Sequence, residues 1–121
     1  MKISISSQGP NLDSPVGPRF GRASQFLIYD TDATSYEVLS NMENLNAAQG
    51  AGIKTAETIA NHGVQVLITG HCGPKAFSAL KQAGIEVVGG AEGMTVAQAL
   101  EKYKSDELSV LNASDVSGHW K

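Results

Sequence analysis

The fold class follows from one stretch of the chain, Val64–Pro74, which reads VQVLITGHCGP. Its first half is a nearly continuous apolar run, which is typical of a strand buried on both faces of a parallel sheet. Its second half is a glycine-rich turn that ends at Pro74, a residue suited to the first position of a helix. A buried strand that turns directly into a helix predicts an α/β fold.

The same alternation continues on both sides of this stretch. Apolar residues three to four positions apart predict a helix over about 50–61, and a similar pattern predicts another over 74–84. A short apolar strand follows at 85–88, and Thr95 and Gln98 have the spacing of a capping box that begins a third helix. This β-α-β-α-β order requires parallel strands joined by right-handed crossovers.

The N-terminal third adds a strand at about 2–6 and a hairpin whose strands lie at 25–30 and 36–39. The whole order is therefore β-β-β-α-β-α-β-α. It predicts a three-layer α/β/α domain with a five-stranded mixed sheet of order 3-2-1-4-5, in which strand 2 is antiparallel. We expect residues 1–105 to form this single domain and residues 106–121 to form a polar C-terminal tail.

Composition excludes several classes of protein. The chain has 121 residues, 41% of them apolar, which suits one domain with a substantial core. Its net charge of −3 lacks the basic excess expected of a nucleic-acid-binding protein. No apolar run approaches the length of a membrane span, and the N-terminus does not resemble a signal peptide. A single Cys is consistent with a reducing cytoplasm.

The predicted topology brings four connections to one edge of the sheet. Strands one, three, four and five all end there, and we call it the carboxyl edge. It gathers the connections 7–22, 41–52, 70–74 and 89–94. Strands one and four flank a topological switch point, where open α/β sheets bind ligands. The loops 7–22 and 70–74 should therefore face each other.

The residues in these two loops suit an anionic or metal-bearing ligand. Arg19 and Arg22 are the only arginines in the chain, and the guanidinium fork favours anions. His71 and Cys72 immediately precede a predicted helix N-terminus, which attracts anions and favours a thiolate. Imidazole and thiolate together form a plausible pair of soft-metal ligands, although two residues are too few for a closed zinc site.

Some of these residues have equally good structural explanations. Cys72 could be a small buried apolar residue rather than a ligand. Gly50 and Gly52 could form an anion-binding nest or simply allow close approach of a helix to the sheet. Phe20 has the position of an aromatic anchor within its loop. These alternatives remain open at the level of sequence.

Three motifs in order resemble the dinitrogenase iron–molybdenum cofactor biosynthesis family: residues 18–22 (PRFGR), 50–56 (GAGIKTA) and 70–77 (GHCGPKAF). This family includes NifX-like and NafY-like proteins, the C-terminal part of NifB, and the orange protein of sulfate reducers. The resemblance covers about residues 1–104. It implies a ribonuclease-H-like fold and non-covalent binding of an anionic metal–sulfur cluster, either an iron–molybdenum cofactor precursor or a molybdenum–copper sulfide.

The cluster-binding residues expected from the motifs and from the resemblance are Arg19, Phe20, Arg22, Gly50, Gly52, Gly70, His71, Cys72 and Gly73. Among them, His71 and Cys72 are the candidates for a direct bond to metal. The expected partners are the cluster itself, proteins that donate or accept it, and associated ATPases.

We expect a carrier rather than an enzyme, and two other functions are weighed against it. One is a small regulatory module for a phosphorylated metabolite, which would use the same arginines. The other is a thiol redox enzyme based on Cys72, although the chain has no second Cys to resolve a disulfide. A nuclease is excluded because strand one carries none of the carboxylates that two-metal catalysis requires.

Overall fold

The computed structural model describes residues 1–42 and 51–111. Its strands are β1 (Lys2–Ser7), β2 (Gln25–Asp30), β3 (Ser35–Ser40), β4 (Val66–Ile68), β5 (Glu86–Gly89) and β6 (Ser109–Val110). Its helices are the 3₁₀ turn η1 (Phe20–Arg22) and the α-helices α2 (Ala51–Ala60), α3 (Pro74–Gln82) and α4 (Val96–Lys104). The strands form one sheet of order β3-β2-β1-β4-β5-β6.

The sheet confirms the predicted order of the first five strands. β2 is antiparallel to both β1 and β3, while β1, β4 and β5 are mutually parallel. The prediction of only five strands is wrong, because β6 pairs antiparallel with β5. This strand has two residues, both exposed, and so carries no apolar alternation that sequence could reveal. Residues 112–121 of the expected tail lie outside the described residues.

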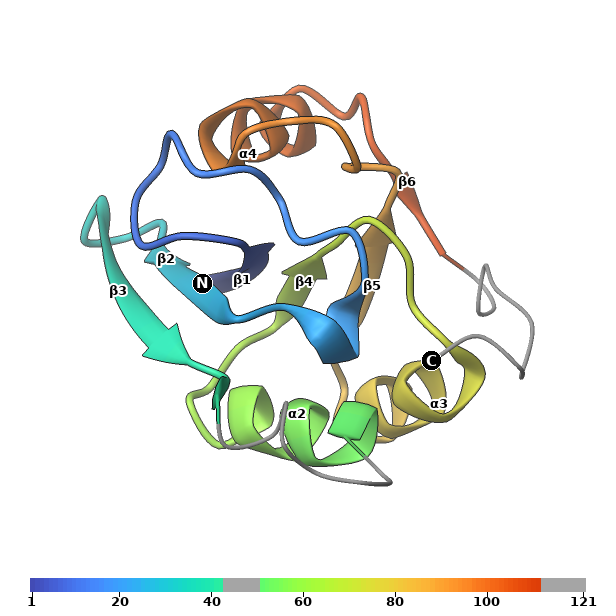
Figure 1. Ribbon diagram of the computed structural model, residues 1–121. Coiled ribbons are helices and arrows are strands. Elements are labelled where there is room, and N and C mark those ends of the chain that lie inside the picture. The colour runs from blue at the N-terminus through green and yellow to red at the C-terminus, as the bar shows by residue number, and fades with distance from the viewer. Residues whose placement is uncertain (43–50, 112–121) are drawn as a thin grey trace.

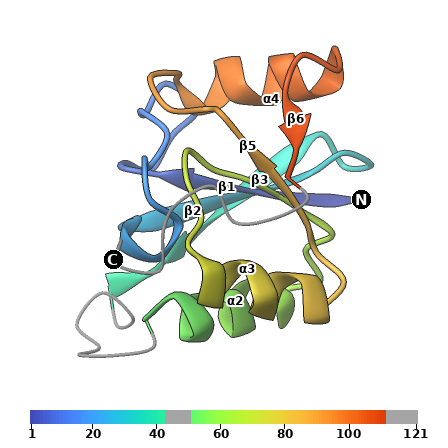
Figure 2. The same cartoon turned by 90° about the vertical axis from the view of Figure 1, so that its right-hand side faces the viewer.

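Helices cover both faces of the sheet, as Figures 1 and 2 show. α2 and α3 pack side by side on one face, and α4 lies on the other. Two apolar clusters fill the spaces between these layers. Alternation along β1 places Ile3 and Ile5 in the cluster under α4, while the buried residues between and after them, Ser4 and Ser6, are polar. The α/β class is therefore confirmed, and the ribonuclease-H-like assignment stays a prediction.

The ends of the helices follow the expected local chemistry. The hydroxyl of Thr95 accepts the backbone N–H of Gln98, and the Gln98 side chain accepts the N–H of Thr95, which confirms the capping box. Pro74 is the first residue of α3. Gly63 and Gly84 follow α2 and α3 with φ of 76° and 77°, the left-handed conformation that ends helices.

The parallel strands and β3 end at the same edge of the sheet, on the left in Figure 2. The loops that follow β1, β4 and β5 all lie along this carboxyl edge. Within residues 1–42 and 51–111, no helix combines the length and the apolar character needed to cross a bilayer.

Candidate anion-binding site

The two loops expected to face each other are joined directly by backbone hydrogen bonds. The N–H of His71 donates to the carbonyl of Pro18 at 2.8 Å, and the N–H of Phe20 donates to the carbonyl of His71 at 3.0 Å. These bonds make Arg19 and His71 partners in a parallel β-bridge. The expected juxtaposition is confirmed, and it is a contact rather than an open crevice at this point.

Gly70 allows this contact because it has no side chain. A Cβ on Gly70 would lie 2.6 Å from the carbonyl oxygen of Pro18 and 2.9 Å from its Cα. Both atoms belong to the backbone, so no side-chain movement could relieve the clash. Gly70 therefore contributes to the site by permitting close approach of the loops.

The bridge determines on which side of the two paired loops the neighbouring side chains lie. Paired residues project to the same side of a β-ladder, and residues next to them along the chain project to the opposite side. Arg19 is exposed, and the side chain of His71 is 34% exposed. Phe20 and Cys72 are both buried, at 1% and 0% exposure, in the cluster beneath α2 and α3.

Phe20 and Cys72 therefore anchor the site from within the core. The Phe20 ring packs against Phe26 with centroids 5.5 Å apart. The thiol of Cys72 lies 3.7 Å from the carbonyl oxygen of Gly73, a distance consistent with a weak hydrogen bond. Neither side chain presents surface to a ligand in this structure. Of the alternatives for Cys72, the structure favours the small buried apolar residue.

His71 makes a close contact with Glu92, a residue that sequence analysis did not single out. Its Nε2 lies 2.6 Å from Oε2 of Glu92. Since an ionised carboxylate only accepts hydrogen bonds, Nε2 carries the hydrogen and donates it. A bond from Nε2 to metal would require loss of both this hydrogen and this partner. One Glu in a glycine-rich loop has no pattern that could have identified it beforehand.

A third loop, the one that follows β5, is joined by backbone hydrogen bonds to the two loops that carry Arg19 and His71. The N–H of Gly90 donates to the carbonyl of Gly70 at 3.3 Å, so the loop after β5 is attached to the loop after β4. The loop after β1 is attached to the same segment, because the N–H of Val16 donates to the carbonyl of Met94 at 2.9 Å. Arg19, His71 and Glu92 thus come from three connections that are held together by their backbones.

Comparison with known proteins identifies the family. Residues 1–106 match the family model described as dinitrogenase iron-molybdenum cofactor. The chain belongs to this family. This confirms the resemblance carried by the three motifs.

Other proteins resemble this family member over most of its length. An uncharacterized protein of Methanocaldococcus jannaschii is 36% identical over 89 residues, which cover 72% of each chain. The apo form of the orange protein of Desulfovibrio gigas superposes with a TM-score of 0.93 at 38% identity, covering 95% of this chain and 96% of the other. A Thermotoga protein provisionally assigned as NifB gives a TM-score of 0.84 at 36% identity, covering 95% and 97%.

The remaining predicted site residues of this family member fall in different environments. Arg22 is exposed at the end of η1, and Gly73 is the N-cap residue of α3. Gly52 faces α3, because a Cβ there would lie 3.0 Å from the Cβ of Ala76. The close approach that Gly52 permits is therefore to a helix and not to the sheet. Gly50 lies outside the described residues.

A buried polar network fixes the end of η1. The side-chain amide of Asn41 donates to the carbonyl of Ala23 at 2.8 Å, and the hydroxyl of Thr55 donates to Oδ1 of Asn41 at 3.1 Å. Asn41 and Thr55 are 2% and 0% exposed. This network ties the arginine-bearing loop to the end of β3 and to α2. Sequence analysis missed it because it joins single residues from three distant segments.

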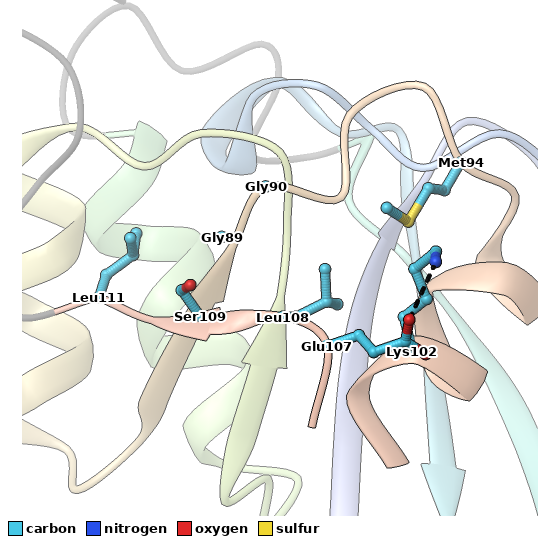
Figure 3. Close-up of a pocket in the computed structure, with 8 residues that line it drawn as sticks. All are labelled: Gly89, Gly90, Met94, Lys102, Glu107, Leu108, Ser109 and Leu111. Atoms are coloured by element: carbon cyan, nitrogen blue, oxygen red, sulfur yellow. Dashed lines mark ion pairs between the residues drawn. The ribbon is translucent and has the colours of Figure 1, made fainter. Parts of the chain in front are cut away.

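Two further features of the described residues concern metal ligands and cavities. In the part of the chain that the structure describes, no three His, Cys, Asp or Glu side chains converge to hold a metal ion. A pocket of about 460 Å³ lies between the loop after β5 and the segment leading into β6, as Figure 3 shows. Its lining includes Met94, Leu108 and the ion pair of Lys102 with Glu107, 3.5 Å apart. None of the predicted site residues lines it.

Proposed function

We propose that this protein binds and carries an anionic metal–sulfur cluster non-covalently at the carboxyl edge, and that it is a carrier rather than an enzyme. The observation that carries the proposal is the Arg19–His71 bridge. The bridge supports the proposal because paired residues of a β-ladder project to the same side. A permanently charged guanidinium and an imidazole N–H donor would then lie on one side of two hydrogen-bonded loops.

The roles of the individual residues follow from their exposure. Arg19 and Arg22 are exposed and would neutralise the charge of the cluster. His71 would donate a hydrogen bond to a sulfide, or bind metal once Nε2 is free of Glu92. The backbone N–H of His71 already bonds to Pro18, so it is not counted among the donors to the cluster. Phe20, Cys72 and Gly70 would hold the loops in place.

The nature of the cargo rests on family membership and on the close relatives. The family is described by the iron–molybdenum cofactor, and the orange protein superposes over nearly the whole chain. We therefore propose a cluster of molybdenum and sulfide with iron or copper as the second metal. Proteins that donate or accept such clusters, and associated ATPases, are the proposed partners, and the cytoplasm is the proposed location.

The proposal is tested by adding tetrathiomolybdate and copper(I) to the purified protein without oxygen and recording its visible absorption. We expect a new protein-bound band that survives gel filtration. Arg19→Ala should weaken uptake by about tenfold or more, because hydrogen bonds to charged groups contribute roughly 1.5–3 kcal/mol. Lys81→Ala is the matched control, since it removes one positive charge from the last turn of α3.

Two results would contradict the proposal. The first is wild-type protein that stays colourless after gel filtration. The second is equal uptake by Arg19→Ala and Lys81→Ala, which would show that loss of any positive charge has the same effect.

A further inference from the structure

His71 already has an anionic partner on the surface proposed for the cluster. Its Nε2 donates to the carboxylate of Glu92 at 2.6 Å. Both side chains are partly exposed, His71 at 34% and Glu92 at 57%. The donor that the proposed function assigns to an anionic ligand is therefore engaged by an anion of the chain itself.

The backbone that carries Glu92 is held in place on both sides. The N–H of Ala91 donates to the carbonyl of Thr69 at 3.4 Å, and the N–H of Met94 donates to the carbonyl of Ala91 at 3.1 Å. Gly93 gives the loop its turn, with a φ of 88°. Since the backbone is attached to neighbouring loops and the Glu92 side chain reaches solvent, rotation of that side chain alone would separate it from His71.

We propose that Glu92 determines the affinity of the site by competing with the anionic ligand for the Nε2–H of His71. The inference rests on the proposed function. A bound cluster would displace the carboxylate into solvent, and the carboxylate would return to His71 when the cluster is released. Such competition favours ligands that carry more negative charge than one carboxylate, because they gain more from Arg19 and His71 together. It also lowers the net affinity, which suits a protein that must pass its cargo on.

The test compares the binding of tetrathiomolybdate to wild-type protein and to Glu92→Gln by isothermal titration calorimetry without oxygen. Gln keeps the size of the side chain and removes its charge. We expect Glu92→Gln to bind roughly two- to fivefold more tightly, the range that corresponds to an exposed ion pair. Glu86→Gln makes the same change of charge at the start of β5, at the opposite edge of the sheet, and should bind like wild type.

A double variant shows whether Glu92 acts through His71. In a His71→Ala background, Glu92→Gln should tighten binding by less than it does alone, because the contested donor is gone. Equal tightening in both backgrounds would overturn the competition and leave simple charge repulsion. Wild-type binding with no tightening in Glu92→Gln would overturn the role of Glu92 and leave the proposed function standing. Absence of binding by wild type and by every variant, with copper(I) present as well as without it, would overturn the proposed function, and this inference with it.

Discussion

Gly70 and Pro18 are in such close contact that only glycine fits at position 70. A Cβ there would meet three backbone atoms of Pro18 at 2.6–3.0 Å. The contact lies directly beside the Arg19–His71 bridge, so the spacing of the two site loops depends on it.

Gly70→Ala should therefore separate the loops and destabilise the fold by about 1–3 kcal/mol, the usual cost of forcing extra volume into a packed position. Urea unfolding gives the stability, and hydrogen exchange of the His71 amide reports on its bond to Pro18. Gly63→Ala is the control for a loss of stability without the loop contact, because its positive φ strains Ala while nothing lies within 4 Å of a Cβ. It should lower the free energy of unfolding without separating the two loops. Equal protection of the His71 amide in wild type and Gly70→Ala would contradict this explanation.

Cys72 should contribute to stability and not to cluster uptake. Its side chain is fully buried in the cluster beneath α2 and α3. Cys72→Ala should cost about 1–2 kcal/mol by leaving a small cavity, while uptake of tetrathiomolybdate and copper(I) persists. A folded Cys72→Ala variant that takes up no cluster would instead show that the thiol reaches the metal.

The capping box should stabilise α4 without influencing the site. Thr95→Ala removes the acceptor for the Gln98 N–H and should lower the free energy of unfolding by about 1 kcal/mol. Ser78→Ala, at an exposed position within α3, should be neutral or slightly stabilising. Both variants should take up cluster like wild type, and a loss of uptake in Thr95→Ala would tie α4 to the site.

Asp30 should make the β2–β3 turn sensitive to acid. The backbone N–H of Asp32 donates to its carboxylate and holds the pKa of Asp30 below its ordinary value, against a smaller opposing effect of desolvation. A carboxyl whose pKa is lower in the folded state adds stability above its unfolded pKa, and this stability is lost as the pH falls through the folded pKa. Unfolding between about pH 6 and pH 3 should therefore be less pH-dependent for Asp30→Asn than for wild type. Identical pH dependence would rule out this role.

Local signals in the sequence were sufficient to predict most of the fold. The capping box at Thr95 and the apolar strand around Leu67 each depend on residues close together in the chain, and both lie where expected. The short strand β6 could not be predicted, because its pairing with β5 involves two exposed residues. Its existence depends on a contact between distant segments and not on a local pattern.

The position of the site at the carboxyl edge could be predicted, but the side chains that face outward there could not. Topology alone brought the loops of Arg19 and His71 to one edge. Which side chains point outward depends on the bridge between these loops, a long-range pairing with no local signature. That is why sequence left the role of Cys72 open and did not detect Glu92. The burial of Cys72 and the position of Glu92 beside His71 both follow from backbone hydrogen bonds that form only in the folded chain.

The central claim is that the loops joined by the Arg19–His71 bridge form the cluster site. Its most direct test is the mapping of backbone amide chemical shifts by NMR while tetrathiomolybdate and copper(I) are added without oxygen. The account predicts that the largest changes fall at residues 19–22, 70–73 and 90–93. Changes concentrated at residues 102, 107–109 and 111, which line the pocket beside β6, would contradict it, as would a spectrum that does not change.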